Sequence, residues 1–164
     1  MQEKQNFKFW RQKMGANPWL YLVNYQPDIN SVLQTLRHRE FQSGRYFPAI
    51  DYVFFPLRPD HPSLGAQHDS IEAAIEDAGA DGTQTILDIR EISNERLPST
   101  ASPLEPIELI SVFGTEMPSI DMVADTDEIP NEIFDFIGRG QSVYIVLYEN
   151  GQPEKILFIG YSYD

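Results

Sequence analysis

The dipeptide Asn150-Gly151 constrains the fold more than any other feature of this sequence. It separates two segments, 142–149 and 154–161, that are rich in β-branched, aromatic and other apolar residues. Asn-Gly between two such segments is the strongest short-range signal for a β-hairpin, because both turn positions need a positive φ. Both segments are almost continuously apolar, which is typical of strands covered on both faces. The sequence therefore predicts a C-terminal hairpin in the centre of a sheet.

The length and composition fit one domain with one core. The chain has 164 residues, of which 41% are hydrophobic, and no run of about 18 apolar residues that could span a membrane. It contains no cysteine, which excludes disulfides and cysteine-based metal sites. The first 13 residues lack the apolar stretch of a secretory signal. We therefore expect a soluble, cytoplasmic protein, and no motif calls for a cofactor.

Helix start and stop signals divide the middle of the chain. Asp28 or Asn30 can cap a helix that ends at Gly44, and Asp69 with Glu72 forms the pattern of a capping box. Helices are expected over residues 29–41, 70–78, 107–113 and 129–137.

The remaining segments complete the predicted architecture. Residues 19–25 and the alternating residues 83–92 are expected to be strands, and residues 93–106, with three prolines, a connecting loop. The predicted fold class is α+β, with a single domain over residues 18–164. Its mixed or antiparallel sheet has about four strands, its helices pack mainly on one face, and it ends in the hairpin.

The charge is distributed unevenly. The chain has 12 basic and 25 acidic residues. Residues 1–17 contain four of the basic residues and one of the acidic ones. The remainder therefore has 8 basic and 24 acidic residues, a net charge of −16. Such a body repels nucleic acid and anionic lipid, so neither is expected as a partner. The basic segment 1–17 is expected to be a disordered or weakly ordered tail, and the natural start is Met1 or Met14.

The segment from Glu105 to Asp135 holds nine acidic residues and no basic one. It is either a solvated surface or the face that meets a basic protein partner. It does not match a calcium loop, because Pro130 stands where the turn needs glycine. The candidate partner-binding residues are Glu105, Glu108, Glu116, Asp121, Asp125, Asp127 and Glu128.

A proline-rich segment, 45–68, contains the candidate ligand-binding residues. An arginine followed by aromatic residues can bind an anionic or planar group, and two histidines can act as bases or ligands. No metal site is expected, because the histidine spacing does not match short metal motifs. No Gly-x-Ser-x-Gly motif is present, so an enzyme is not favoured. The candidates are Arg45, Tyr46, His61 and His68.

Three stretches, 45–48, 70–89 and 158–164, resemble parts of small uncharacterised bacterial proteins. That resemblance implies no function. Charge segregation without a catalytic motif indicates a non-enzymatic, regulatory or immunity-like interaction domain that binds a basic protein. The alternative is a small-molecule enzyme with a pocket under the proline-rich segment. The oligomeric state stays open.

Overall fold

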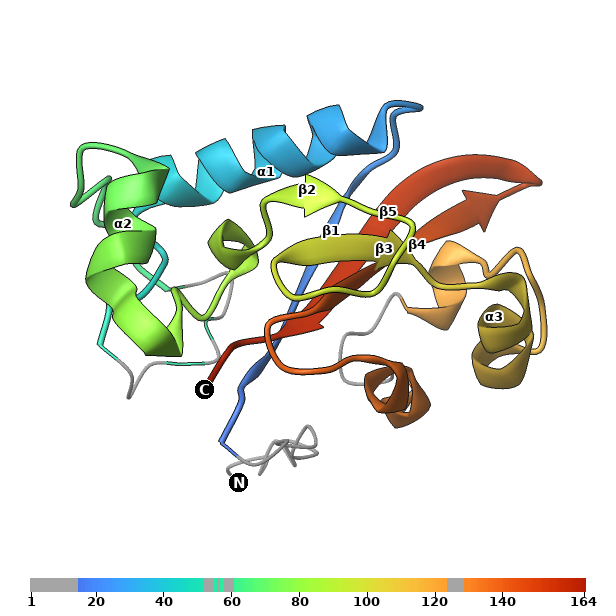
Figure 1. The fold of residues 1–164 in the computed structure, drawn as a ribbon. Coiled ribbons are helices and arrows are strands. Elements are labelled where there is room, and N and C mark those ends of the chain that lie inside the picture. The colour runs from blue at the N-terminus through green and yellow to red at the C-terminus, as the bar shows by residue number, and fades with distance from the viewer. Residues whose placement is uncertain (1–14, 52–54, 56, 58–60, 124–128) are drawn as a thin grey trace, which may run out of the picture.

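A five-stranded mixed sheet forms the centre of the protein (Figure 1). The computed structural model describes residues 15–51, 55, 57, 61–123 and 129–164. The strand order is β1-β5-β4-β3-β2, antiparallel from β1 to β4 and parallel from β4 to β2. The strands are β1 (Pro18–Asn24), β2 (Glu91–Ile92), β3 (Thr100–Pro103), β4 (Ser142–Glu149) and β5 (Gln152–Tyr161).

The predicted hairpin is confirmed. Strands β4 and β5 pair up to Glu149 and Gln152, and the turn residues Asn150 and Gly151 have φ values of 51° and 76°. Both strands lie inside the sheet, with β1 and β3 as their outer neighbours. The nearly continuous apolar pattern of the hairpin follows from this position, because helical segments cover the sheet on both faces.

Three α-helices and several 3₁₀ turns pack around the sheet. Helix α1 (Ile29–Ser43) packs on one face together with η3 (Ile86–Asp88), and α2 (Ile71–Ala78) packs beside them. The other face is covered by α3 (Pro106–Phe113), η4 (Ile120–Met122) and η6 (Asn131–Phe136). A short turn, η2 (Gly79–Asp81), follows α2. The α+β prediction is thereby confirmed, with the longest helix on one face and shorter helical segments on the other.

Helix α1 begins and ends where its signals predict. The Asp28 side chain accepts a hydrogen bond from the backbone N–H of Ser31 at 3.1 Å, and Gly44 closes the helix with a φ of 73°. For α2 the capping residue is Ser70 rather than Asp69, because the Ser70 hydroxyl accepts from the N–H of Ala73.

The predictions for residues 83–106 are wrong in two places. Residues 83–92 form the buried turn η3 and only the two-residue strand β2, and the supposed loop 93–106 contains β3. The alternating pattern was interpreted as a strand with one buried and one exposed face. Residues 83–89 are instead all buried, so the spacing of the apolar residues does not distinguish a strand from a buried turn here.

The structure locates the start of the domain more closely. Residues 1–14 lie outside the described residues, but Ala16 is fully buried and the N–H of Asn17 donates to the Ser162 hydroxyl at 2.8 Å. The expected tail therefore does not include Ala16 and Asn17. In the part of the chain that the structure describes, no helix has the length and apolarity needed to cross a bilayer.

Candidate functional site

Two of the predicted ligand-binding residues, Tyr46 and His68, meet in a hydrogen-bonded chain with Asp77. The Tyr46 hydroxyl lies 2.8 Å from His68 Nδ1, and His68 Nε2 lies 2.8 Å from Asp77 Oδ2. A carboxylate only accepts hydrogen bonds, so Nε2 donates, and in the neutral ring Nδ1 then accepts from Tyr46. The Tyr46 oxygen in turn accepts from the backbone N–H of Gln67 at 3.2 Å. Both ring nitrogens of His68 and the Tyr46 hydroxyl thus have hydrogen-bond partners.

The surroundings of Tyr46 favour a structural role for this hydrogen-bonded chain. Tyr46 is fully buried, and burial raises the pKa of its hydroxyl above the ordinary value, so the phenolate is disfavoured as a nucleophile or base. The bonds instead join the two ends of the proline-rich segment. The N–H of Gly65 donates to the carbonyl of Ser43 at 3.0 Å in the same place. We interpret the chain as a structural closure of this loop.

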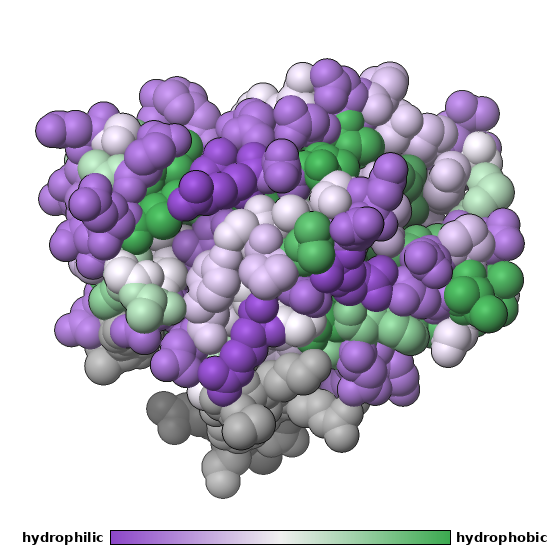
Figure 2. Space-filling view, viewed as in Figure 1, coloured by the Kyte–Doolittle hydropathy of each residue, from purple (hydrophilic) through white to green (hydrophobic). Residues whose placement is uncertain are grey.

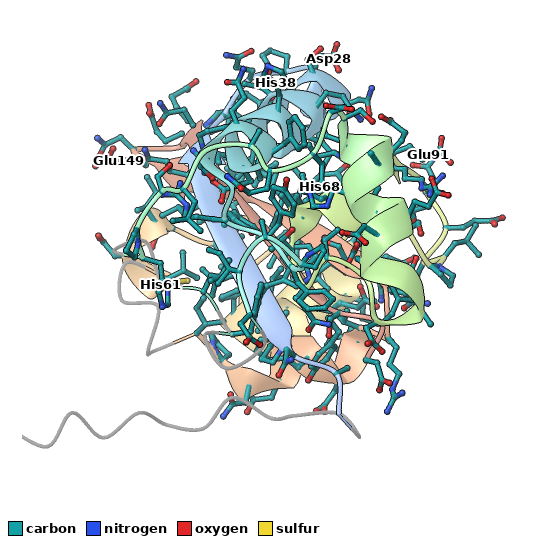
Figure 3. The ribbon with its side chains drawn as sticks, turned by 90° about the vertical axis from the view of Figure 1, so that its left-hand side faces the viewer. Asp28, His38, His61, His68, Glu91 and Glu149 are labelled. Atoms are coloured by element: carbon teal, nitrogen blue, oxygen red, sulfur yellow. The ribbon has the colours of Figure 1, made fainter. Side chains whose placement is uncertain are left out.

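The other two candidates, Arg45 and His61, do not join Tyr46 and His68. The guanidinium of Arg45 lies 3.4 Å from the carboxylate of Glu40, a buried acid on α1. Figure 3 shows His61 well apart from His68, which lies beside α2. The structure therefore brings together one pair of the four residues, and the small-molecule enzyme stays a prediction without an assembled pocket.

Exposed apolar side chains are concentrated in the segment that begins with α3. Ile107 is 74% exposed and Ile110 48% exposed, and both lie on one face of the helix because they are three residues apart. Met117, in the turn after α3, and Met122, in η4, are also exposed. Figure 2 shows hydrophobic residues at the right-hand edge of the molecule, where α3 lies in Figure 1.

Exposed acidic side chains belong to the same segment of the chain as these apolar residues. Glu105 precedes the first turn of α3, Glu116 follows its end, and Asp121 belongs to η4; all three are exposed. Among the described residues, no basic side chain forms an ion pair with any of them. Glu116 and Asp121 are therefore available to a partner, whereas the Glu105 side chain also accepts from the backbone N–H of Glu108 in the capping box of α3.

The remaining predicted partner-binding residues divide into two groups. Glu108 is already used inside the protein, because both of its carboxylate oxygens accept hydrogen bonds from Arg96. Asp125, Asp127 and Glu128 lie outside the described residues.

A buried polar cluster around Asp88 was missed from the sequence. Asp88 Oδ1 accepts from the N–H and hydroxyl of Thr83 at 2.8 and 2.9 Å, while Oδ2 is buried without a hydrogen-bond partner. Burial raises the pKa of Asp88 to about 6. A charged residue between Leu87 and Ile89, in a run of buried apolar residues, is the signal that would have identified it. At 3% exposure Asp88 is closed to substrates.

Nothing in the described residues points to a metal centre, since no three histidine or acidic side chains are grouped so that they could hold an ion. The likeness to small bacterial proteins stays a prediction. Comparison with known proteins adds no assignment: no family model, no curated protein and no solved structure matches this chain.

Proposed function

We propose that this protein is a non-enzymatic interaction domain that binds a basic protein partner through the surface around α3. We call this the α3 surface, and it consists of Glu105, Ile107, Ile110, Glu116, Met117, Asp121 and Met122. A regulatory or immunity-like role in the cytoplasm is the concrete form of the proposal.

The observation that carries the proposal is that the acids of this surface are exposed and are not used in ion pairs within the described residues. Glu105, Glu116 and Asp121 are exposed and have no basic partner among the described residues. Beyond residue 17 the chain has a net charge of −16, so the field of the whole protein attracts cationic proteins and repels nucleic acid. Complementary charge mainly accelerates association and selects against wrong partners.

Isothermal titration with basic probe proteins at about 0.05 M and about 0.5 M salt tests the charge argument, because screening removes long-range attraction at the higher ionic strength. The variant Glu116→Gln/Asp121→Asn removes two charges from the α3 surface. The matched control, Glu149→Gln/Glu154→Gln, removes two exposed charges near the hairpin turn. We expect binding that weakens with salt and weakens several-fold more in the first variant than in the control. Equal effects of both variants, or salt-insensitive binding, would falsify the proposal.

A further inference from the structure

Helix α3 is apolar on nearly all sides, although half of it faces solvent. Six of its eight residues are apolar, and only Glu108 and Ser111 are polar. A surface helix of a globular protein ordinarily has its charged residues on the outer face, and a helix that is apolar all round is ordinarily buried. Here one side packs on the core through Leu109, Val112 and Phe113.

The outer face of α3 carries no charge at all. Its exposed positions are Pro106, Ile107, Ile110, Ser111 and the closing Gly114. Nothing lies within 4 Å of the place where a side chain on Gly114 would begin, so small residues leave the end of this face open. Exposed apolar area bordered by polar residues marks an interaction site more often than a chance surface.

The acids lie at the two ends of this apolar face. Glu105 stands at the N-terminal end of α3 and Glu116 just beyond Gly114. The eight helical residues of α3 span about 12 Å of this interval, at 1.5 Å per helical residue. A ligand that matches this layout offers aliphatic side chains in the middle and positive charges on either side.

We infer that the partner presents a basic amphipathic helix, whose aliphatic side chains pack on Ile107 and Ile110 and whose lysines or arginines meet Glu105, Glu116 and Asp121. This inference rests on the proposed function and adds the chemistry of the partner segment. Recognition through an amphipathic helix concentrates affinity in a few apolar anchors, while the charges around them fix orientation and partner choice. A second copy of this chain is a poor occupant, because a symmetric contact would bring the same acidic residues against one another.

A helix-forming peptide of leucine and lysine, with leucines on one face, serves as the probe. Two further peptides separate its two properties: one has the same composition in a scrambled, non-amphipathic order, and one has glutamate in place of lysine. We expect the amphipathic basic peptide to bind about tenfold more tightly than the scrambled one, which corresponds to the loss of one apolar anchor. The glutamate peptide should not bind.

Variants of the protein locate the contact. Ile107→Ser/Ile110→Ser should weaken binding of the amphipathic peptide about tenfold or more, the scale expected for losing apolar anchors. The matched control, Leu64→Ser/Leu97→Ser, changes two exposed leucines elsewhere and should leave binding unchanged. Amide chemical shifts that move in α3 and η4 on titration give a second readout that does not depend on variant stability.

The possible results distinguish this inference from the proposed function. If the scrambled peptide binds as tightly as the amphipathic one and the isoleucine variant is neutral, the inference is wrong, while salt-dependent binding of basic proteins keeps the proposed function intact. If none of the peptides binds, the inference is also wrong. A variant without residues 2–13 tests whether the basic N-terminal segment competes for the same surface. If this variant binds the amphipathic peptide and the full chain does not, the α3 surface binds the chain's own basic segment, and the external partner is rejected.

Discussion

Arg96 and Glu108 form a bidentate ion pair, with 2.8 Å between Nη1 and Oε1 and 2.9 Å between Nη2 and Oε2. The same guanidinium donates to the carbonyls of Pro103 and Phe136. Arg96 therefore joins the end of β3, helix α3 and η6. No residue of α3 is fully buried, so we expect the ion pair to contribute to the stability of this helix alongside the packing of Leu109, Val112 and Phe113.

Replacing Arg96 by glutamine should loosen α3. The substitution removes the two guanidinium N–H groups that donate to the Glu108 carboxylate. Charge-assisted hydrogen bonds of this kind contribute about 1.5–3 kcal/mol each at most to stability. We expect at least a tenfold loss of amide exchange protection in α3, measured by hydrogen–deuterium exchange, with the sheet unaffected. The control Arg96→Lys keeps the charge but not the planar fork, so its effect should be intermediate. Unchanged protection in the glutamine variant would show that packing alone holds α3.

The same pair predicts how α3 responds to acid. Hydrogen bonds from Arg96 lower the pKa of Glu108 below its ordinary value of 4.5. A lowered carboxyl pKa contributes stability that is present above the ordinary pKa and lost as the pH falls through the folded-state value. Protection of α3 should therefore decline in acid in the natural protein, and this decline should be smaller in Arg96→Gln. An identical acid response of both proteins would contradict the assignment.

Gly44 and Gly114 provide a matched comparison, because both close a helix with nearly the same φ, 73° and 74°. Alanine at either position costs about 1–2 kcal/mol for the left-handed backbone. At Gly44 the new methyl would also clash with the carbonyl oxygen of Gly65, whereas at Gly114 it meets nothing within 4 Å. We expect Gly44→Ala to lower the free energy of unfolding, measured in urea, by at least about 2 kcal/mol more than Gly114→Ala. Equal losses of unfolding free energy in the two variants would mean that Gly65 moves away from Gly44 at little energetic cost.

Tyr46→Phe removes the hydroxyl that links His68 to Gln67. His68 Nδ1 and the N–H of Gln67 then lose this partner, which should cost about 1–2 kcal/mol of stability. Tyr144→Phe is the control, because no hydrogen bond of its hydroxyl is found within the described part of the chain. Thermal unfolding of the two variants measures the difference. A stability equal to that of the control would indicate that water replaces the hydroxyl.

Local signals predicted those elements whose cause is local. The hairpin follows from two turn residues, and α1 follows from Asp28, Gly44 and its apolar spacing, so both appear where expected. Strand β3 does not have such a signal. Its residues are Thr, Ala, Ser and Pro, which are typical of a loop, and its strand conformation comes from parallel pairing with β4, about 40 residues further along the chain.

The candidate site shows the same division. Tyr46 and His68 were grouped because they lie in one segment, and the loop closure does bring them together. Asp77, the third member of the chain, lies on α2, and no spacing rule links it to them. The exposure of Ile107 and Ile110 could not be predicted either, because an apolar helix pattern does not tell which face a neighbouring layer covers.

Asp88 predicts an unusual dependence of stability on pH. Burial raises its pKa to about 6 in the folded protein, from an ordinary value of 3.8. The folded state therefore favours the neutral carboxylic acid. Burying the charged carboxylate costs stability, and this cost is absent below the ordinary pKa of 3.8 and complete above the folded-state pKa of about 6. The free energy of unfolding should fall by up to about 3 kcal/mol from this group as the pH rises from about 4 to about 7.

Asp88→Asn tests this directly, because its side-chain oxygen can still accept both hydrogen bonds from Thr83. At pH 8 the variant avoids burying the charge, and we expect it to be more stable than the natural protein by up to about 3 kcal/mol, with no such gain near pH 4. Asp88→Ala is the contrasting variant: it leaves the two Thr83 donors without their acceptor and should be destabilised at every pH. Urea unfolding across this pH range measures all three proteins. If Asp88→Asn is less stable at pH 8, the carboxylate is held by its attraction to the buried Arg37, and the charged form is the one that the fold requires.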